Sequence, residues 1–372
     1  MEQFTLLFDP LATHHISQPL VGFCLLAQAK QLRFTCKYMN TSSLFGHNQL
    51  VIAKRHDGAS IVFDTHDFGK LHIQNEAFDA AMRENTVIAY FRRSHKPRYY
   101  DCLRTSALQH PLGLNYHVSC PQNPYHRLAA VSPEMLKNAE RRHIFLRKCL
   151  ARLPFGALSD RQFYPAQFEQ PAEHPQDASV LFQTRTWFPL EEHDPDCDPR
   201  RVDTILQKHP HLTPILAMDE TRAALIRLLR KEYGAAAIAG FSRNRFALAM
   251  YPDLVFPQNQ TKRRTYLQSM KRARVCLTTV GLAQSTGWKC GEYVAAAKAI
   301  VSERVLDVLP GDFAAERHYL PFANPEEAMR QTALLWDDPA KRAEMQACNA
   351  AYYQAYLHPA KMIARALLEA ED

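Results

Sequence analysis

The chain has 372 residues, more than one hydrophobic core ordinarily holds, so two domains are expected. Hydrophobic residues make up 47% of it, which suits a packed globular protein and excludes a disordered one. No apolar run reaches the roughly 18 residues that a membrane-spanning helix needs. The net charge of +7 favours anionic partners such as nucleotides, phosphates, lipid headgroups or nucleic acid.

The N-terminal half alternates short apolar runs with segments of helical spacing. Its first residues, MEQFTLLFDP, lack a basic stretch and are interpreted as a strand and not as a signal peptide, which predicts a cytoplasmic location. A turn is expected at Asp57-Gly58. Because strands alternate with helices, we expect parallel pairing in an α/β architecture. The predicted strands are Phe4–Phe8, Arg33–Tyr38, Gln49–Ala53, Ser60–Asp64, Thr86–Phe91 and Leu114–Ser119, and the predicted helices are 19–31, 76–84 and 132–153.

A second alternating series follows a proline-rich stretch. This divides the chain into an N-terminal domain (1–155), a linker (156–178), a C-terminal domain (179–355) and a C-terminal helix (356–372) expected to pack back on the first domain. The second series comprises strands at Val180–Phe182, Ala235–Ala239, Val275–Thr279 and Ala299–Ser302, and helices at 221–233, 262–272, 289–297, 326–336 and 340–356.

The stretch from Val275 to Glu303 carries the clearest chemical signal. It is interpreted as a buried strand, a polar loop, a helix and a second strand. Gly281 and Gly287 predict unusual backbone angles in the loop, where Ser285 and Thr286 supply hydroxyl groups. The helix begins near residue 288, and its first N–H groups suit a phosphate or diphosphate.

Two charged residues in that helix extend the pattern. Lys289 stands at the helix N-terminus, where a cation interacts unfavourably with the helix dipole. We therefore interpret it as a residue that pairs with the negative charge of a ligand. Glu292 lies one turn further on. Its carboxylate suits either the two hydroxyl groups of a ribose or a favourable interaction with the dipole.

This segment resembles the donor-binding region of GT-B glycosyltransferases. Within that family it is most similar to the group-1-like, CgeB-type members. Gly287-Trp288 corresponds to the start of the family's Gly-Phe-Gly, Glu292 to its ribose-binding glutamate, and residues 298–301 to the strand that follows. Residues 319–327 resemble the family's next turn and helix, and Arg185 resembles the arginine that contacts the donor diphosphate. The resemblance covers residues 178–360.

The resemblance implies a GT-B fold, in which two Rossmann-like domains face each other across a cleft. It implies transfer of a sugar from a nucleotide-sugar co-substrate to a glycan, lipid-linked or other hydroxyl acceptor, as in polysaccharide biosynthesis, with no bound cofactor and no metal. Retaining members carry a second glutamate where this chain has Gln284. The stereochemistry therefore stays open.

An inverting enzyme needs a base on the N-terminal domain. Loops at strand ends are the expected place for it, which makes Asp9, His14 and His15 the first candidates and Asp64 and His66 the second. The basic run at Arg92, Arg93, His95, Lys96 and Arg98 is either a solvated turn or a surface for an anionic acceptor or membrane.

Two further classes of function stay open. A sugar-nucleotide epimerase would share the donor site, and a non-catalytic protein that binds nucleic acid or an anionic surface would use the positive charge. The basic residues are scattered and no nucleic-acid-binding motif occurs, so no nucleic acid is expected, whereas peripheral contact with an anionic membrane is compatible with the charge. Nine cysteines without a CxxC pair predict neither a disulfide framework nor a zinc site.

Overall fold

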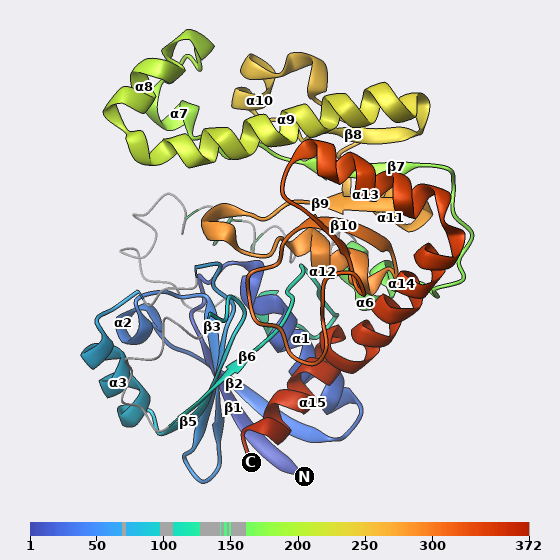
Figure 1. Cartoon of the computed structure of the whole chain (residues 1–372). Coiled ribbons are helices and arrows are strands. Elements are labelled where there is room, and N and C mark those ends of the chain that lie inside the picture. Colours follow the sequence, from blue (N-terminus) through green and yellow to red (C-terminus); the bar gives the residue numbers. More distant parts are fainter. Residues whose placement is uncertain are drawn as a thin grey trace. The chain divides into compact units, whose positions relative to one another are not determined.

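The chain folds into two compact α/β units (Figure 1). The structure is a computed structural model, and it describes residues 1–68, 72–96, 107–126, 142, 145–146, 149 and 161–371. Unit 1 comprises Met1–Phe168, Leu306–Phe313 and Tyr352–Asp372, and unit 2 comprises Glu169–Val305 and Ala314–Ala351. Each unit has its own mainly parallel sheet, so the predicted fold class of two Rossmann-like α/β domains is confirmed.

Unit 1 contains a six-stranded sheet in the order β2-β1-β3-β4-β5-β6. Five strands run parallel, and β3 runs antiparallel to both of its neighbours. Without β3 the order is β2-β1-β4-β5-β6, a common doubly wound arrangement. The strands are β1 (Glu2–Phe8), β2 (Leu32–Tyr38), β3 (Leu50–Arg55), β4 (Ser60–Asp64), β5 (Val87–Arg92) and β6 (Leu108–Pro111).

Helices cover both faces of this sheet, because its strands bury alternate side chains on opposite sides. Phe4, Leu6 and Phe8 share a core with α1 (Ser17–Gln28) and α15 (Pro359–Glu369). Ile52, Val62 and Tyr90 pack on the other face with side chains of α2 (Ser42–Phe45) and α3 (Asn75–Glu84) (Figure 1). At the crossing of α1 and α15, a Cβ on Gly22 would lie 2.4 Å from Ile363 Cγ1, so only glycine allows this approach.

Unit 2 contains a five-stranded parallel sheet in the order β11-β10-β9-β7-β8. In chain order this is again the 2-1-3-4-5 arrangement, so both units share one winding. The order reverses between β7 and β9, which is the topological switch point of the unit. The strands are β7 (Val180–Thr184), β8 (Ala237–Phe241), β9 (Val275–Thr278), β10 (Ala299–Glu303) and β11 (Leu320–Phe322).

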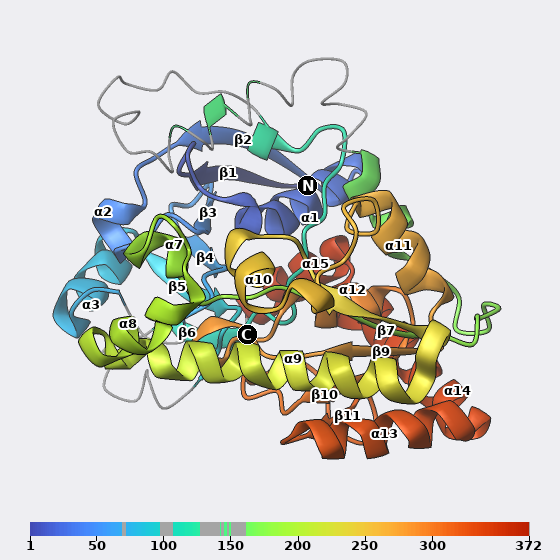
Figure 2. The same cartoon turned by 90° about the horizontal axis from the view of Figure 1, so that it is seen from above.

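The sheet of unit 2 is also sandwiched between helices (Figure 2). Val180, Leu277 and Val301 share a core with α9 (Thr213–Tyr233) and α13 (Pro325–Asp337). Residues at alternate positions, such as Cys276 and Ile300, are buried toward α11 and α12. The helices not yet given are α6 (Pro165–Phe168) in unit 1, α7 (Leu190–His193), α8 (Val202–Lys208), α10 (Arg245–Met250), α11 (Arg263–Arg272), α12 (Trp288–Ala295) and α14 (Pro339–Tyr352).

Three expectations about the fold need correction. Residues 114–119 form no strand, and the edge strand of unit 1 is β6 instead. The parallel pairing expected throughout fails at β3, because the tight turn at Asp57-Gly58 joins β3 to β4 as an antiparallel hairpin. The predicted domain limits also differ from the observed ones, since Leu306–Phe313 belongs to unit 1 and unit 2 begins at Glu169. Most of the predicted helix 132–153 lies outside the described residues, and so does Arg98.

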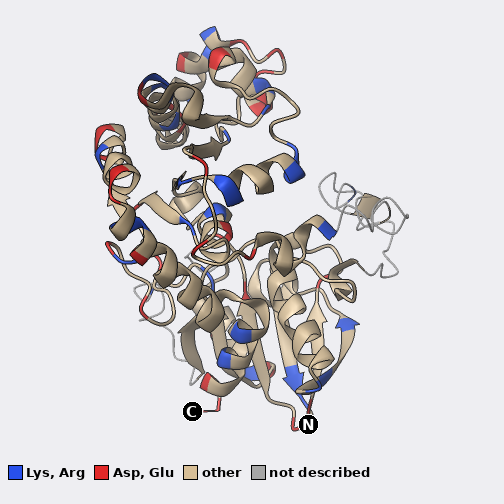
Figure 3. Cartoon of the chain, turned by 90° about the vertical axis from the view of Figure 1, so that its right-hand side faces the viewer, with Lys and Arg blue, Asp and Glu red and all other residues tan. Residues whose placement is uncertain are grey.

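In the described residues, charges of both signs are mixed, and no helix is suited to crossing a membrane. Basic and acidic residues are interspersed along the ribbon of both units (Figure 3). Among the described residues, no helix combines the length and the apolar character needed to cross a bilayer.

Candidate functional site

The switch point of unit 2 is where a doubly wound sheet binds ligands, outside the carboxyl ends of its strands. An arginine follows the carboxyl end of three of these five parallel strands. Arg185 comes directly after β7, Arg243 follows β8, and Arg304 comes directly after β10, and all three are exposed. This edge of the sheet therefore presents positive charge to solvent, as an anionic ligand requires.

The loop after β7 holds the predicted Arg185. Its guanidinium lies 3.5 Å from the ring centroid of Trp187, in a cation–π stack. Thr186 exchanges hydrogen bonds with the side chain of Asn244 at 2.8 and 3.0 Å, which ties this loop to the start of α10. Asn244 also caps α10 by accepting from the Ala247 N–H at 2.7 Å.

The loop after β9 differs from the expectation in its backbone. Gly281 and Gly287 have φ of −93° and −67°, angles that other residues also adopt, so the predicted unusual glycine angles are wrong. The left-handed residues are Ala283 and Gln284, with φ of 55° and 57°. Ser285 Oγ donates to the Leu282 carbonyl at 2.9 Å and closes the loop on itself.

At Gly287 a close backbone approach, and not an unusual backbone angle, favours glycine. It immediately precedes α12, and a Cβ built on it would lie 3.3 Å from the Thr279 carbonyl oxygen. The first turn of α12 is thereby drawn close to the end of β9. The predicted helix start near residue 288 is confirmed.

Lys289 and Glu292 meet around one aromatic ring. Lys289 Nζ lies 4.0 Å from the ring centroid of Tyr266, a residue of α11. The Tyr266 hydroxyl donates to Glu292 Oε2, and Arg263 Nη1 donates to Glu292 Oε1 at 2.9 Å. Glu292 is 4% exposed, so its carboxylate is already engaged by two side chains of α11. The sequence contained no signal for this pairing beyond the basic character of the helix.

The charges of this cluster shift one another. Burial lowers the pKa of Lys289 to about 8, an effect that the nearby Glu292 opposes and that Arg263 and, more weakly, Arg185 reinforce. Burial alone would raise the pKa of Glu292, but Arg263 and Lys289 hold it below its usual value. Arg185 after β7 and Lys289 in the helix after β9 are therefore two cations from separate segments at one switch point of unit 2.

Three charged residues behind these loops, two of them buried and Glu303 partly buried, were missed in the sequence. Arg222 and Asp219 of α9 are 3% and 0% exposed, and Glu303 is the last residue of β10. Arg222 bonds to both loops, Asp219 accepts backbone N–H groups after β7, and Glu303 accepts the Val280 N–H at 2.7 Å. A signal did exist, because Asp219 and Arg222 fall in the apolar stripe of α9.

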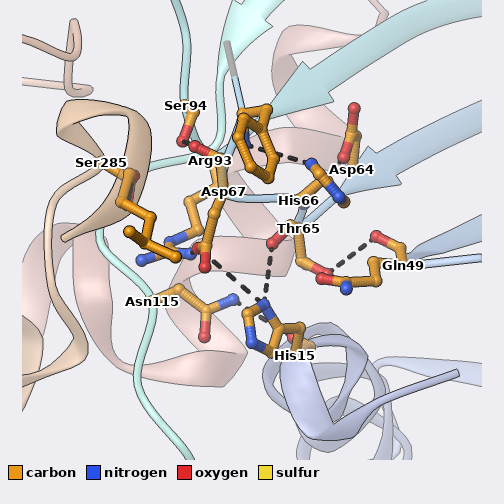
Figure 4. A network of polar contacts seen from close by, with 12 residues as sticks. His15, Gln49, Asp64, Thr65, His66, Asp67, Arg93, Ser94, Asn115 and Ser285 are labelled. Carbon is orange, nitrogen blue, oxygen red and sulfur yellow. Dashed lines mark hydrogen bonds and ion pairs between the residues drawn. The ribbon is translucent and has the colours of Figure 1, made fainter. Parts of the chain in front are cut away.

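In unit 1 the carboxyl ends of β1 and β4 bring the predicted base candidates to one edge. His15 Nδ1 lies 3.4 Å from the Thr65 carbonyl oxygen and 3.9 Å from Asp67 Oδ1 (Figure 4). A carbonyl oxygen only accepts, so this contact puts the proton on Nδ1 and the lone pair on Nε2. Asn115 donates to the His15 carbonyl at 3.2 Å and fixes the backbone there. Asp67 is the last residue of the cluster 64–67, which also holds the second-choice candidates Asp64 and His66.

Burial keeps His15 uncharged. It lowers the pKa of His15 well below its usual value, and the positive charge of Arg93 adds to the effect. His14 packs against His117 with ring centroids 4.5 Å apart, and Asp9 accepts the Leu11 N–H at 2.7 Å. His15 therefore has a neutral ring in which Nε2 is the acceptor nitrogen.

Asp64 lies at the centre of a fully buried network. Its carboxylate accepts from the Tyr90 hydroxyl at 2.7 Å and from the His66 N–H at 2.8 Å, and Arg92 Nε lies 3.3 Å away. Burial opposes the charge, but His47 and Arg92 lower the pKa of Asp64 far below its usual value. Such a carboxylate does not take up a proton, so the second-choice assignment of Asp64 as a base is not supported. Burial also lowers the pKa of His66, to about 3.

The basic run after β5 is not a solvated turn. Arg92, Arg93, His95 and Lys96 are all at most 6% exposed. Arg93 pairs with Asp67, and Lys96 Nζ lies 3.6 Å from Asp307 Oδ1 in the segment Leu306–Phe313. These charged groups are therefore buried within unit 1. The alternative, that these four residues form an exposed surface for an anionic acceptor or membrane, is also wrong.

No metal site emerges from the described part of the chain. Among the described residues, no group of three or more histidine, cysteine, aspartate or glutamate side chains could hold a metal ion. No disulfide joins any two of the eight described cysteines. Cys120 is buried, and Ser119 and His126, its neighbours, bond to each other at 3.0 Å.

Comparison with known proteins gives little beyond this. No protein-family model and no curated protein matches the sequence. The chain is similar to a putative UDP-N-acetylglucosamine 2-epimerase from Listeria monocytogenes, with 9% identity, 99% of this chain and 95% of that chain covered, and a TM-score of 0.37. It is also similar to sucrose-phosphate synthase from Thermosynechococcus elongatus, with 13% identity, coverage of 96% and 91%, and a TM-score of 0.31. Likeness at this level carries no argument about activity.

Replacing Asp64 by asparagine should destabilise unit 1 by about 3–5 kcal/mol at neutral pH, because Arg92 loses its buried countercharge. The pKa of Asp64 is lower in the folded than in the unfolded state. Its contribution is therefore present above the unfolded pKa of about 4 and is lost as the pH falls below it. Urea unfolding at pH 7 and pH 3 should show the gap between wild type and Asp64→Asn narrowing at pH 3.

The half-exposed turn residue Asp57 offers the control, since Asp57→Asn should change stability little at either pH. An Asp64→Asn variant as stable as the wild type at pH 7 would contradict the role given to this network.

Proposed function

We propose that the protein is a glycosyltransferase of the GT-B type, in which unit 2 binds a nucleotide-sugar donor and unit 1 binds the acceptor. The observation that carries the proposal is the pair of cations at the switch point of unit 2. Arg185 follows β7, and Lys289 stands in the first turn of α12, which follows the neighbouring strand β9, so both lie at the switch point. Among the described residues, Glu292 is the carboxylate close to Lys289, and Arg263 already pairs with it, so the positive charge at the switch point favours a ligand that carries a diphosphate.

The donor's diphosphate would lie against the N-terminal turn of α12 and these two cations. Both the helix dipole and the cations stabilise the charge that develops on the leaving phosphate, which is often the largest contribution to catalysis. This supports transfer without a resident metal or prosthetic group. Glu292 stays the candidate for the ribose hydroxyls, because a carboxylate has about four acceptor positions and its two bonds to α11 use one on each oxygen.

On unit 1, His15 is the proposed base for an inverting reaction. Its Nε2 would take the proton of the acceptor hydroxyl as the acceptor oxygen bonds to the anomeric carbon and the bond from that carbon to the phosphate oxygen breaks. Asp67, 3.9 Å from Nδ1, would stabilise the imidazolium that forms. The acceptor is proposed as a glycan or lipid-linked hydroxyl compound, and a peripheral encounter with an anionic membrane is part of that proposal.

The first experiment is a thermal-shift series with UDP-, GDP-, ADP-, dTDP- and CMP-sugars. Stabilisation by one nucleotide class, by about 2.7 kcal/mol at a hundredfold excess over Kd, is the expected result. An epimerase would convert the bound sugar without any acceptor, which product analysis of the same samples would reveal. Indifference to all five nucleotides, together with salt-dependent binding of DNA or RNA, would overturn the proposal.

Lys289 gives this binding a pH signature. Its pKa in the free protein is about 8, and a bound diphosphate would raise it, so binding takes up a proton above pH 8. Affinity should then stay constant below pH 8 and fall by up to about tenfold per pH unit above it. Calorimetric titrations with the selected nucleoside diphosphate from pH 6.5 to pH 9.5 measure this. The Lys289→Met variant should bind more weakly and lose the pH dependence, and an unchanged profile in this variant would mean that the lysine does not face the ligand.

His15 separates catalysis from donor binding. The His15→Gln variant keeps a polar side chain of similar reach without a titrating ring, and should lower kcat by about 10²- to 10⁴-fold. The affinity for the donor should stay within twofold of wild type, because the residue lies in unit 1. His14→Gln serves as the matched control at the neighbouring position. Equal losses in the two variants would point away from His15 as the base.

A further inference from the structure

Helix α9 carries two charges in the stripe that faces its sheet. Asp219 and Arg222 lie one turn apart and are 0% and 3% exposed, with Arg222 Nη1 3.6 Å from Asp219 Oδ1. Burial of a charged pair costs free energy unless its remaining hydrogen-bonding capacity is satisfied. The partners of this pair are therefore informative, and they all lie at the switch point.

Arg222 joins the two loops that flank the switch point. Its Nη1 donates to the Arg185 carbonyl at 2.9 Å, directly after β7. Its Nε donates to Thr279 Oγ1 at 2.9 Å and its Nη2 to the Val280 carbonyl at 2.7 Å, both directly after β9. One planar guanidinium thus fixes the spacing of two loops that no strand ladder holds beyond the sheet. Burial lowers the pKa of Arg222 only to about 10, so it is charged at neutral pH.

Asp219 and Glu303 complete the same frame. Asp219 accepts the Trp187 N–H at 2.8 Å and the Phe188 N–H at 2.8 Å, which fixes the chain just after Arg185. Glu303 of β10 accepts the Val280 N–H at 2.7 Å, so the Val280 residue is held through its carbonyl by Arg222 and through its N–H by Glu303. Each loop is therefore bound through both donor and acceptor groups of its backbone.

We propose that Arg222, oriented by Asp219, is a positioning residue of the nucleotide-sugar site: it sets the distance between the loop that carries Arg185 and the loop that leads into α12, and with it the fit to a diphosphate. This inference rests on the proposed function. It adds that donor affinity depends on a buried side chain that does not touch the donor. The planar fork matters as well as the charge, because three acceptors in fixed directions need three separate N–H donors.

The same helix offers a matched control. Arg230, two turns further along α9, also binds three acceptors with one guanidinium, namely the carbonyls of Ala239, Asp253 and Leu254. These acceptors lie in β8 and in the segment that follows α10, away from the ends of β7 and β9. Removing either fork costs the fold comparable hydrogen bonds, but only Arg222 connects the two loops of the proposed site.

The experiment compares Arg222→Lys, Arg222→Met and Arg230→Lys in the full chain. The probes are inorganic pyrophosphate and the nucleoside diphosphate that stabilises the wild type, titrated calorimetrically, with the melting temperature of each variant measured alongside. Both Arg222 variants should weaken binding of both probes by about 10- to 100-fold, since a displacement of about 1 Å has effects of that size. Arg230→Lys should bind within twofold of wild type at a similar loss of melting temperature.

The outcomes separate the two proposals. A wild type that binds neither probe refutes the proposed function, whereas wild-type affinity in both Arg222 variants refutes only the positioning role. Equal weakening by Arg230→Lys would reduce the effect to general stability, and full recovery by lysine but not methionine would show that charge alone suffices, against the geometric claim. If the Arg222 variants do not fold, Asp219→Asn tests the same frame, with weakened binding of pyrophosphate expected and unchanged binding overturning it.

Discussion

The doubly wound strand order is the constraint on which the rest of this structure depends. In both units the strand order of the sheet reverses beside the first strand. The loops that follow the two strands flanking this point therefore lead to opposite faces of the sheet. In unit 2 this places Arg185 and the segment leading into α12 at one edge. In unit 1 it places His15 and the Thr65–Asp67 loop at the corresponding edge, although β3 is inserted there. Polar and charged side chains come together at these edges, because the carboxyl ends of the parallel strands all lie there.

Buried charge is the second common feature, and it occurs where loops must be held. Asp64 with Arg92 in unit 1 and Asp219 with Arg222 in unit 2 are nearly inaccessible to water. Desolvation makes each group unfavourable alone, so each persists through paired charge and backbone hydrogen bonds. The consequence is a rigid backbone at the strand ends, which suits sites that need fixed positions more than mobile ones. Side chains such as Arg185 remain exposed at these strand ends.

Much of the local structure could be predicted from periodicity and turn chemistry. Strands β1, β4 and β7, helices α3 and α11, and the start of α12 follow from alternation, helical spacing and capping, because these signals act within a few residues. For the candidate site, the sequence placed residues on their elements but did not predict their contacts. Lys289 and Glu292 were found on one helix, but their meeting around Tyr266 required α11 to pack beside α12. The positive φ at Ala283 and Gln284 carried no signal, because neither is a glycine.

The sequence by itself determined the alternating α/β architecture, the two-domain organisation and the strand, loop, helix and strand between Val275 and Glu303. Only the tertiary structure decided that the basic run after β5 is buried, that Leu306–Phe313 returns to unit 1, and that Arg222 joins the two loops of the switch point. The physical reason is the distance along the chain over which each interaction acts. Propensity and periodicity act between neighbours in the chain, whereas the energy of a buried charge depends on partners that are brought close only by folding.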